Sequence, residues 1–98
     1  MARRRRYSEQ AFGPTMEQLM EEAGVTYRSL GAKTQLSAGY LNHVVHGNRP
    51  VPSSELLERL AEALGVEPEH FLEYRVRVIT SRLEKLPDMV DRLYKRLG

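Results

Sequence analysis

Apolar residues recur every three or four positions along most of the chain, and this spacing places them on one side of a helix. The clearest case is Leu57, Leu60, Ala61 and Leu64, which form a continuous stripe when the segment is helical. No segment of strand length alternates apolar and polar residues convincingly, and no internal repeat is visible. The sequence therefore predicts an all-α fold.

Residues that cap helices divide the first half of this pattern into three short helices. Thr15 begins a Thr-Met-Glu-Gln sequence with the form of a capping box, so the first helix is expected to start there and to end at Gly24. Thr26 is expected to cap the second helix and Ser37 the third. A tight turn over residues 34–36 would join these two helices.

Similar signals mark two further helices in the second half of the chain. Ser53 or Ser54 can cap a fourth helix, which would end at Gly65. Pro68 suits the first turn of a fifth helix that holds residues 71–72. The chain is therefore expected to contain five helices before its C-terminal segment.

The order helix, tight turn, helix over residues 27–45 is the helix-turn-helix pattern. The stretch "TYRSLGAKTQLSAGYLNHVVHGNRPVPSSELLERLAEALGVEPEHFL" extends it through a Gly-x-Arg-x-x-Pro loop and the helix "LLERLAEALGV". The sequence from Thr15 to Tyr74 resembles the Cro and phage-repressor-like (XRE-type) family of DNA-binding domains. This resemblance implies a five-helix lambda-repressor-like domain over residues 14–73. The like-charge run and polar residues before Gly13-Pro14 indicate a flexible basic arm over residues 1–13, and a C-terminal helical extension is expected over residues 74–98.

Two positions depart from the pattern of that family. The second helix usually has alanine after its buried leucine, where the chain has Gly31, which still permits a close approach but costs about 1 kcal/mol in helix propensity. The turn usually has glycine at a left-handed position, where the chain has Gln35. A positive φ at Gln35 would cost on the order of 1 kcal/mol. We expect both changes to affect stability more than function.

The resemblance implies that the third helix, over about residues 37–46, lies in the major groove of double-stranded DNA. The predicted base-contacting residues are Ser37, Ala38, Gly39, Asn42, His43 and His46. Ala38 and Gly39 are small enough for a close approach, and Ala38 can meet a thymine methyl group. Asn42 can pair with adenine through two hydrogen bonds, and His43 can donate to guanine or to phosphate. Ordinary surface roles for Asn42, His43 and His46 remain the alternative.

Contacts to the DNA backbone are expected from groups that flank the third helix. The predicted residues are Tyr27, Arg28, Lys33, Tyr40, Asn48 and Arg49. Arg49 is the first choice because it lies between Gly47 and Pro50, in a loop that would hold its guanidinium in place. For Tyr40, a half-buried packing role is equally open.

The distribution of charge supports an anionic partner for this segment. The chain has no Asp or Glu between Glu22 and Glu55, whereas the same window contains Arg28, Lys33 and Arg49. One surface is therefore expected to attract anions. Chance clustering in a stretch rich in Ser, Thr and Asn is the alternative interpretation.

The N-terminal arm accounts for the positive net charge of +2. Arg3, Arg4, Arg5 and Arg6 supply four of the 15 Lys and Arg residues, which leaves 11 basic and 13 acidic groups in residues 7–98. Basic arms of this kind reach into a neighbouring minor groove, or they add nonspecific attraction to phosphate. Both interpretations remain open.

The C-terminal segment is expected to be helical from Tyr74 onward and to carry a heptad-like apolar seam. The seam residues are Val76, Ile79, Leu83, Leu86, Val90, Leu93 and Leu97. Pro87 interrupts the seam, so two short helices are expected in place of one coiled coil. They would dock on a second subunit or back on the domain core. We favour a homodimer, because two recognition helices about one DNA turn apart add specificity.

Several other classes of protein are not supported by the sequence. No apolar run approaches the ~20 residues needed to span a membrane, and no secretory signal precedes the domain. The absence of cysteine excludes disulfides and suits a cytoplasmic protein. His43 and His46 have no acidic ligand beside them, and no catalytic grouping stands out, so we expect no metal, cofactor or enzymatic activity.

The sequence thus predicts a sequence-specific transcriptional regulator of the repressor type that binds double-stranded DNA as a homodimer. A protein-interaction adaptor or antitoxin-like scaffold on the same fold is the alternative. Because 98 residues leave no room for a sensor domain, a regulatory partner protein is one expected source of signal.

Overall fold

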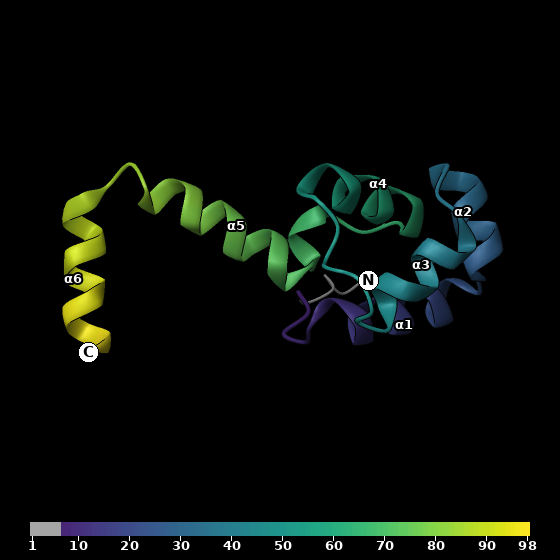
Figure 1. Cartoon of the computed structure of the whole chain (residues 1–98), viewed down its shortest axis with the longest axis horizontal. Coiled ribbons are helices and arrows are strands. Elements are labelled where there is room, and N and C mark those ends of the chain that lie inside the picture. The colour runs from purple at the N-terminus through teal and green to yellow at the C-terminus, as the bar shows by residue number, and fades with distance from the viewer. Residues whose placement is uncertain (1–6) are drawn as a thin grey trace, which may run out of the picture.

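Six α-helices and one short 3-10 helix follow one another through residues 7–98, the part of the chain that this computed structural model describes (Figure 1). No strand occurs among these residues, so the predicted all-α fold is confirmed. The helices are α1 (Phe12–Ala23), α2 (Tyr27–Thr34), α3 (Ala38–Val45), α4 (Ser54–Leu64), η1 (Pro68–His70), α5 (Leu72–Leu83) and α6 (Pro87–Leu97).

A single apolar core lies between α1, α2, α3 and α4, and η1 closes it where α5 leaves the domain. The stripe predicted on the fourth helix belongs to this core: Leu57 and Leu60 are fully buried, and Leu64 is half-buried. The ring of Phe71 packs on that of Phe12 with 5.5 Å between their centroids. This contact joins the beginning of α5 to the beginning of α1.

The first helix begins at Phe12, so the capping box predicted at Thr15 is wrong. Thr15 is buried within α1, where its hydroxyl donates to the carbonyl oxygen of Gln10 at 3.2 Å and lies 2.6 Å from the Ser8 hydroxyl. The true cap comes from α5, because the backbone N–H of Phe12 donates to a carboxylate oxygen of Glu73 at 2.9 Å. The carboxylate of Glu73 therefore caps the first helix, in place of the Thr15 hydroxyl that the sequence predicted.

The segment from residue 7 to residue 13, predicted as part of a flexible arm, contacts the domain. The backbone N–H of Ser8 donates to the carbonyl oxygen of His70 at 3.1 Å, and a guanidinium N–H of Arg75 donates to the Ser8 carbonyl oxygen. The same guanidinium lies 5.4 Å from the centroid of the Tyr7 ring. The arm boundary predicted at residue 13 is thus too far along the chain, and Arg3–Arg6 lie outside the described residues.

Two close approaches of the backbone depend on glycine. A Cβ added to Gly13 would lie 2.2 Å from the carbonyl oxygen of Val45, where α1 crosses the end of α3. A Cβ on Gly31 would lie 2.3 Å from the carbonyl oxygen of Leu36, just after the turn. The close approach predicted at Gly31 is therefore present, and it is tighter than an alanine would allow.

The fifth predicted helix is divided into two elements. Residues 68–70 form the short helix η1, Phe71 is extended, and α5 begins at Leu72. The break predicted at Pro87 is confirmed, because α5 ends at Leu83 and Pro87 is the first residue of α6.

The C-terminal helices extend away from the domain, with α6 at the far end (Figure 1). α6 packs on α5 and contributes nothing to the core. Among the seam residues, Leu83 is half-buried. The exposed seam residues are Val76, Ile79, Leu86, Val90, Leu93 and Leu97. The predicted alternative in which this segment packs back on its own core is therefore not observed.

Candidate nucleic-acid interface

The two helices of the helix-turn-helix unit begin at the predicted caps. The Thr26 hydroxyl accepts a hydrogen bond from the N–H of Ser29 at 3.1 Å, and the Ser29 hydroxyl accepts one from the N–H of Thr26 at 3.0 Å. The Ser37 hydroxyl accepts from the N–H of Tyr40 at 3.0 Å. These local bonds fix where α2 and α3 start, and hence which residues occupy the first turn of α3.

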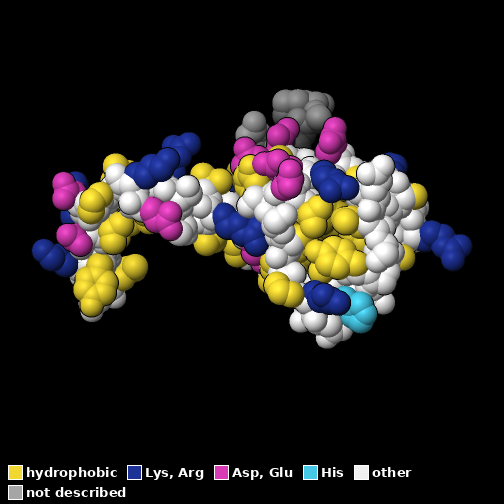
Figure 2. Space-filling view, turned by 45° about the horizontal axis from the view of Figure 1, so that its top comes forward, with side chains coloured by type: hydrophobic (Ala, Val, Ile, Leu, Met, Phe, Trp, Pro, Cys, Tyr) yellow, Lys and Arg dark blue, Asp and Glu magenta, His cyan; other side chains and the backbone are white. Residues whose placement is uncertain are grey.

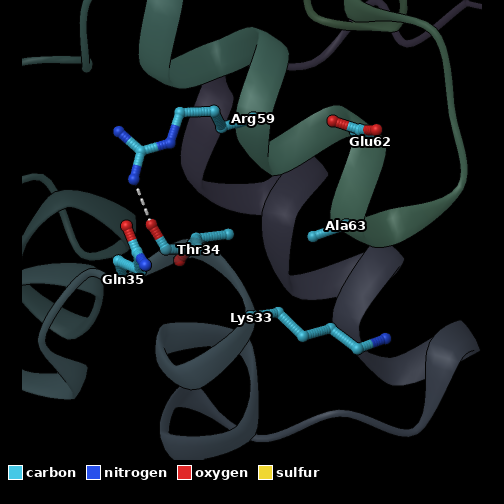
Figure 3. A pocket seen from close by; sticks show the side chains of 6 residues that line it. All are labelled: Lys33, Thr34, Gln35, Arg59, Glu62 and Ala63. Carbon is cyan, nitrogen blue, oxygen red and sulfur yellow. Dashed lines mark hydrogen bonds between the residues drawn. The ribbon is translucent and has the colours of Figure 1, made fainter.

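The turn between these helices has the predicted left-handed residue, since Gln35 has φ 62°. The N–H of Leu36 donates to the carbonyl oxygen of Gly31 at 3.0 Å, and Arg59 on α4 donates to the carbonyl oxygen of Thr34 (Figure 3). Arg59 thereby satisfies a carbonyl that the end of α2 leaves without a helical partner. Lys33 extends away from this contact in the same view.

A shallow recess of about 390 Å³ lies beside this contact. Its lining residues are Lys33, Thr34, Gln35, Arg59, Glu62 and Ala63. Sequence reasoning missed Arg59 because the residue lies on another helix, 25 positions from Thr34.

The predicted base-contacting residues form one continuous exposed surface on α3. Gly39, Asn42, His43 and His46 follow the i, i+3, i+4, i+7 spacing of a helix face, and all four are exposed. The opposite side of α3, made of Leu41, Val44 and Val45, is buried in the core. Ser37 is also exposed and Ala38 is half-buried. Among the described residues, α5 and α6 do not pack on α3, so the tail leaves this surface open.

His46 occupies a more constrained place than the other residues of that surface. Its Nδ1 lies 2.8 Å from the carbonyl oxygen of Asn42, and its Nε2 lies 3.8 Å from a carboxylate oxygen of Glu17 on α1. Its ring also meets the edge of Tyr27, with 6.4 Å between centroids. His46 thus links the end of α3 to α1 and α2.

Glu17 is a neighbour that the sequence analysis did not identify. It lies in α1, before the acid-free window, yet the fold brings it beside Tyr27 and His46. Burial and, to a smaller extent, this carboxylate raise the pKa of the Tyr27 hydroxyl above its ordinary value. The surface around α3 is therefore less free of negative charge than the window indicates.

The predicted backbone-contacting residues surround the exposed face of α3. Arg28, Lys33, Asn48 and Arg49 are exposed, whereas Tyr27 and Tyr40 are half-buried and pack against the core. No carboxylate within residues 7–98 lies at ion-pair distance from Arg28, Lys33 or Arg49. These cations are consequently available to an external anion.

The loop that carries Arg49 is held by the end of α3. Gly47 adopts a positive φ of 79°, and the N–H of Asn48 donates to the carbonyl oxygen of His43 at 2.8 Å. Arg77 on α5 donates to the carbonyl oxygen of Pro52 at 2.8 Å. The loop expected to hold the Arg49 guanidinium is thus supported by contacts at both ends.

Figure 2 shows carboxylates gathered along one edge of the domain. Lys and Arg side chains are spread more widely: some lie beside these carboxylates, and one lies next to a histidine at the opposite edge.

Other kinds of site find no support in residues 7–98. No group of three or more His, Asp or Glu side chains in this range is arranged to hold a metal ion. Within the same range, none of the helices combines the length and apolar character needed to cross a bilayer.

Comparison with known proteins agrees with this geometry. Residues 11–73, more than half of the chain, match the model of the helix-turn-helix domain family. Neither the curated proteins nor the solved structures gave a match. The matched range contains α1 to η1 and the interface described above, in agreement with the resemblance to the Cro and phage-repressor-like family. The chain belongs to the helix-turn-helix domain family.

Proposed function

We propose that the protein is a sequence-specific regulator of transcription that binds double-stranded DNA through α3. The observation that carries this proposal is the exposed stripe of Gly39, Asn42, His43 and His46, opposite the buried stripe of α3. It is flanked by cations that have no carboxylate partner within residues 7–98. The major groove admits one α-helix, and the uncharged polar groups of α3 match the donors and acceptors of base edges. A regulator of this kind would act in the cytoplasm.

The first two turns of α3 would supply the base contacts. Asn42 would pair with adenine, and His43 would donate to guanine or to a phosphate. Ser37 is already engaged as a helix cap, so its hydroxyl would contribute through its remaining lone pair and its proton. His46, linked to Glu17 and Tyr27, would lie at the margin of the base-contacting surface.

Contacts to phosphate would orient the domain on the duplex. Arg28, Lys33, Asn48 and Arg49 are exposed around α3, and they would contact both sides of the groove without reading sequence. The half-buried Tyr27 and Tyr40 would contribute only through their hydroxyl groups.

The protein would act as a homodimer that contacts two half-sites. α5 and α6 expose a row of large apolar side chains that includes Ile79, Val90 and Leu93, and Leu97 at its end is 86% exposed. A surface of this kind is unfavourable in water unless a partner covers it. A second copy is the simplest partner, because two equivalent half-sites require a symmetric pair of domains.

A protein-interaction adaptor or antitoxin-like scaffold is the second candidate function. The observation that favours it is the same exposed apolar face of α6, which a different protein could cover. Such a partner could also transmit a regulatory signal to the DNA-binding form.

Selection of bound sequences from a random DNA pool tests the proposal directly. A regulator of the proposed kind enriches one motif in two symmetric copies about one helical turn apart. An adaptor enriches none and gives no sequence-dependent retardation in a mobility-shift titration at two salt concentrations. Enrichment of a single unrepeated motif would support DNA reading and contradict the dimer.

A further inference from the structure

Gly39 differs from every other glycine of the chain because the fold gives no reason for it. Of the seven glycines, Gly24, Gly47 and Gly65 have a positive φ. A Cβ added to Gly13 or Gly31 would strike a carbonyl oxygen, and Gly98 is the last residue of the sequence. Gly39 has no positive φ, and a Cβ added to it would meet nothing within 4 Å.

A glycine at this position works against the stability of α3. Glycine is the least favourable helix residue after proline, because it loses the most conformational freedom on folding. α3 has only eight residues, so each residue of its first turn matters to whether the helix forms. Alanine would fit the observed backbone at this position. The fold of the single chain therefore does not require glycine here.

The missing side chain lies at the centre of the surface assigned to DNA. Gly39 is one helical turn before Asn42 and His43, and directly opposite the buried side of α3. A side chain at this position would point away from the core. The half-buried Ala38 beside it has only a methyl group, and the exposed Ser37 uses its hydroxyl to cap α3.

We propose that Gly39 leaves room for the 5-methyl group of a thymine, which packs against the backbone of α3 beside the Ala38 methyl. This inference rests on the proposed function and adds to it the identity of one base that the first turn reads. Among the groups on the floor of the major groove, the thymine methyl is the apolar one, so it suits a point on α3 where Ala38 has only a methyl group and Gly39 has no side chain. Close approach here also brings Asn42 and His43 within reach of neighbouring base edges.

The test compares wild type with Gly39→Ala on the DNA site that wild type selects, with thymine or uracil at each thymine position in turn. Burial of one methyl group corresponds to a roughly fourfold change in affinity. Wild type should therefore bind about fourfold more weakly when one particular thymine is replaced by uracil. On the thymine site, Gly39→Ala should bind at least tenfold more weakly than wild type does. The affinity of Gly39→Ala for the uracil site should equal or exceed its affinity for the thymine site.

Thermal unfolding of the same variants separates this role from a structural one. Gly39→Ala should melt at the same temperature as wild type or higher, whereas Gly13→Ala, whose added Cβ meets the Val45 carbonyl, should melt lower. A lowered melting temperature for Gly39→Ala would assign the glycine to the fold and overturn the proposal. The uracil series on wild type needs no variant, so the thymine assignment is tested in either case.

The outcomes distinguish the proposal from the function on which it rests. Failure of wild type to select any site overturns the proposed function itself. Sequence-specific binding that Gly39→Ala leaves unchanged, or binding in which no thymine is sensitive to uracil, overturns the inference and leaves the regulator intact.

Discussion

Glu73 on α5 caps the N-terminus of α1, because one of its carboxylate oxygens accepts the backbone N–H of Phe12 at 2.9 Å. The two residues are 61 positions apart, and Ala11, the residue before α1, offers no capping side chain. The carboxylate also faces the positive end of the α1 dipole. The first turn of α5 therefore packs as part of the helix-turn-helix domain.

Glu73→Ala should destabilise the whole domain. Removal of a helix cap costs about 1–2 kcal/mol, and the free N–H of Phe12 would stay partly buried. The midpoint of urea unfolding should fall accordingly. Glu84→Ala, at the exposed end of α5, is the matched control and should leave the midpoint within a few tenths of a kcal/mol of wild type. Equal midpoints for the two variants would show that Glu73 does not act as the cap.

Gly31→Ala should also destabilise the domain, although alanine is the residue that the family pattern leads one to expect. The added Cβ would lie 2.3 Å from the Leu36 carbonyl oxygen, a backbone atom that cannot move without shifting the turn. Overpacking of this kind costs about 1–3 kcal/mol, which exceeds the gain in helix propensity of about 1 kcal/mol. Thermal unfolding measures the balance, and a melting temperature above that of wild type would mean that the turn relaxes freely.

Features that depend on neighbouring residues could be predicted from the sequence. The caps at Thr26 and Ser37 and the left-handed Gln35 are set by residues within three or four positions, and all three are present in the structure. The predicted start of α1 is wrong because the Thr-Met-Glu-Gln sequence has the form of a capping box but lies inside the helix. Pro14 does not prevent this, because proline is tolerated in the first turn of a helix.

Features that depend on distant residues could not be predicted. Nothing in the local sequence connects Glu73 with Phe12, or Glu17 with His46, because only the packed helices bring these pairs together. The absence of Asp and Glu between Glu22 and Glu55 likewise describes only residues that are neighbours in sequence. It gives no information on Glu17, which α1 places beside His46 at the end of α3.

Asn42→Ala should relax the preference for one base in each half-site. Loss of a bidentate contact to adenine costs about 1–3 kcal/mol on the best site and much less on sites that already lack that base. Competition binding with single-base variants of the selected site measures this difference. Asn42 is exposed, so the variant should fold as wild type does. A uniform loss across all sites would assign Asn42 to the DNA backbone.

Arg49→Ala should weaken binding to all sites by a similar factor. The guanidinium has no carboxylate partner within residues 7–98 and lies in a loop held at both ends, so a phosphate contact would need little ordering. The preference among sites should remain that of wild type. The slope of log K against log salt concentration should become shallower by about 0.9, the contribution of one phosphate contact. Lys85→Ala, on the segment after α5, provides a control with the same loss of charge. A change in base preference for Arg49→Ala would contradict a purely electrostatic role.

Replacement of Arg3–Arg6 by alanine should flatten the salt dependence of DNA binding. Each phosphate that the arm neutralises contributes about 0.9 to the slope of log K against log salt concentration. Binding isotherms between about 50 and 200 mM salt give that slope. The variant keeps Tyr7 and Ser8, which contact the domain, and thermal unfolding checks that the domain remains intact. An unchanged slope would mean that the arm does not contact DNA.

Val90→Asp should separate the subunits without unfolding them. Val90 is 41% exposed in the single chain and lies on the apolar seam of α6, so a carboxylate there is solvated in the monomer but costly in a dimer interface. Sedimentation should change from dimer to monomer, and affinity for DNA with two half-sites should fall at least tenfold while affinity for one half-site remains. Lys95→Asp, on the opposite side of α6, should leave both properties unchanged. A Val90→Asp protein that sediments as wild type does would exclude the α6 seam as the dimer contact, and would leave another partner to cover it.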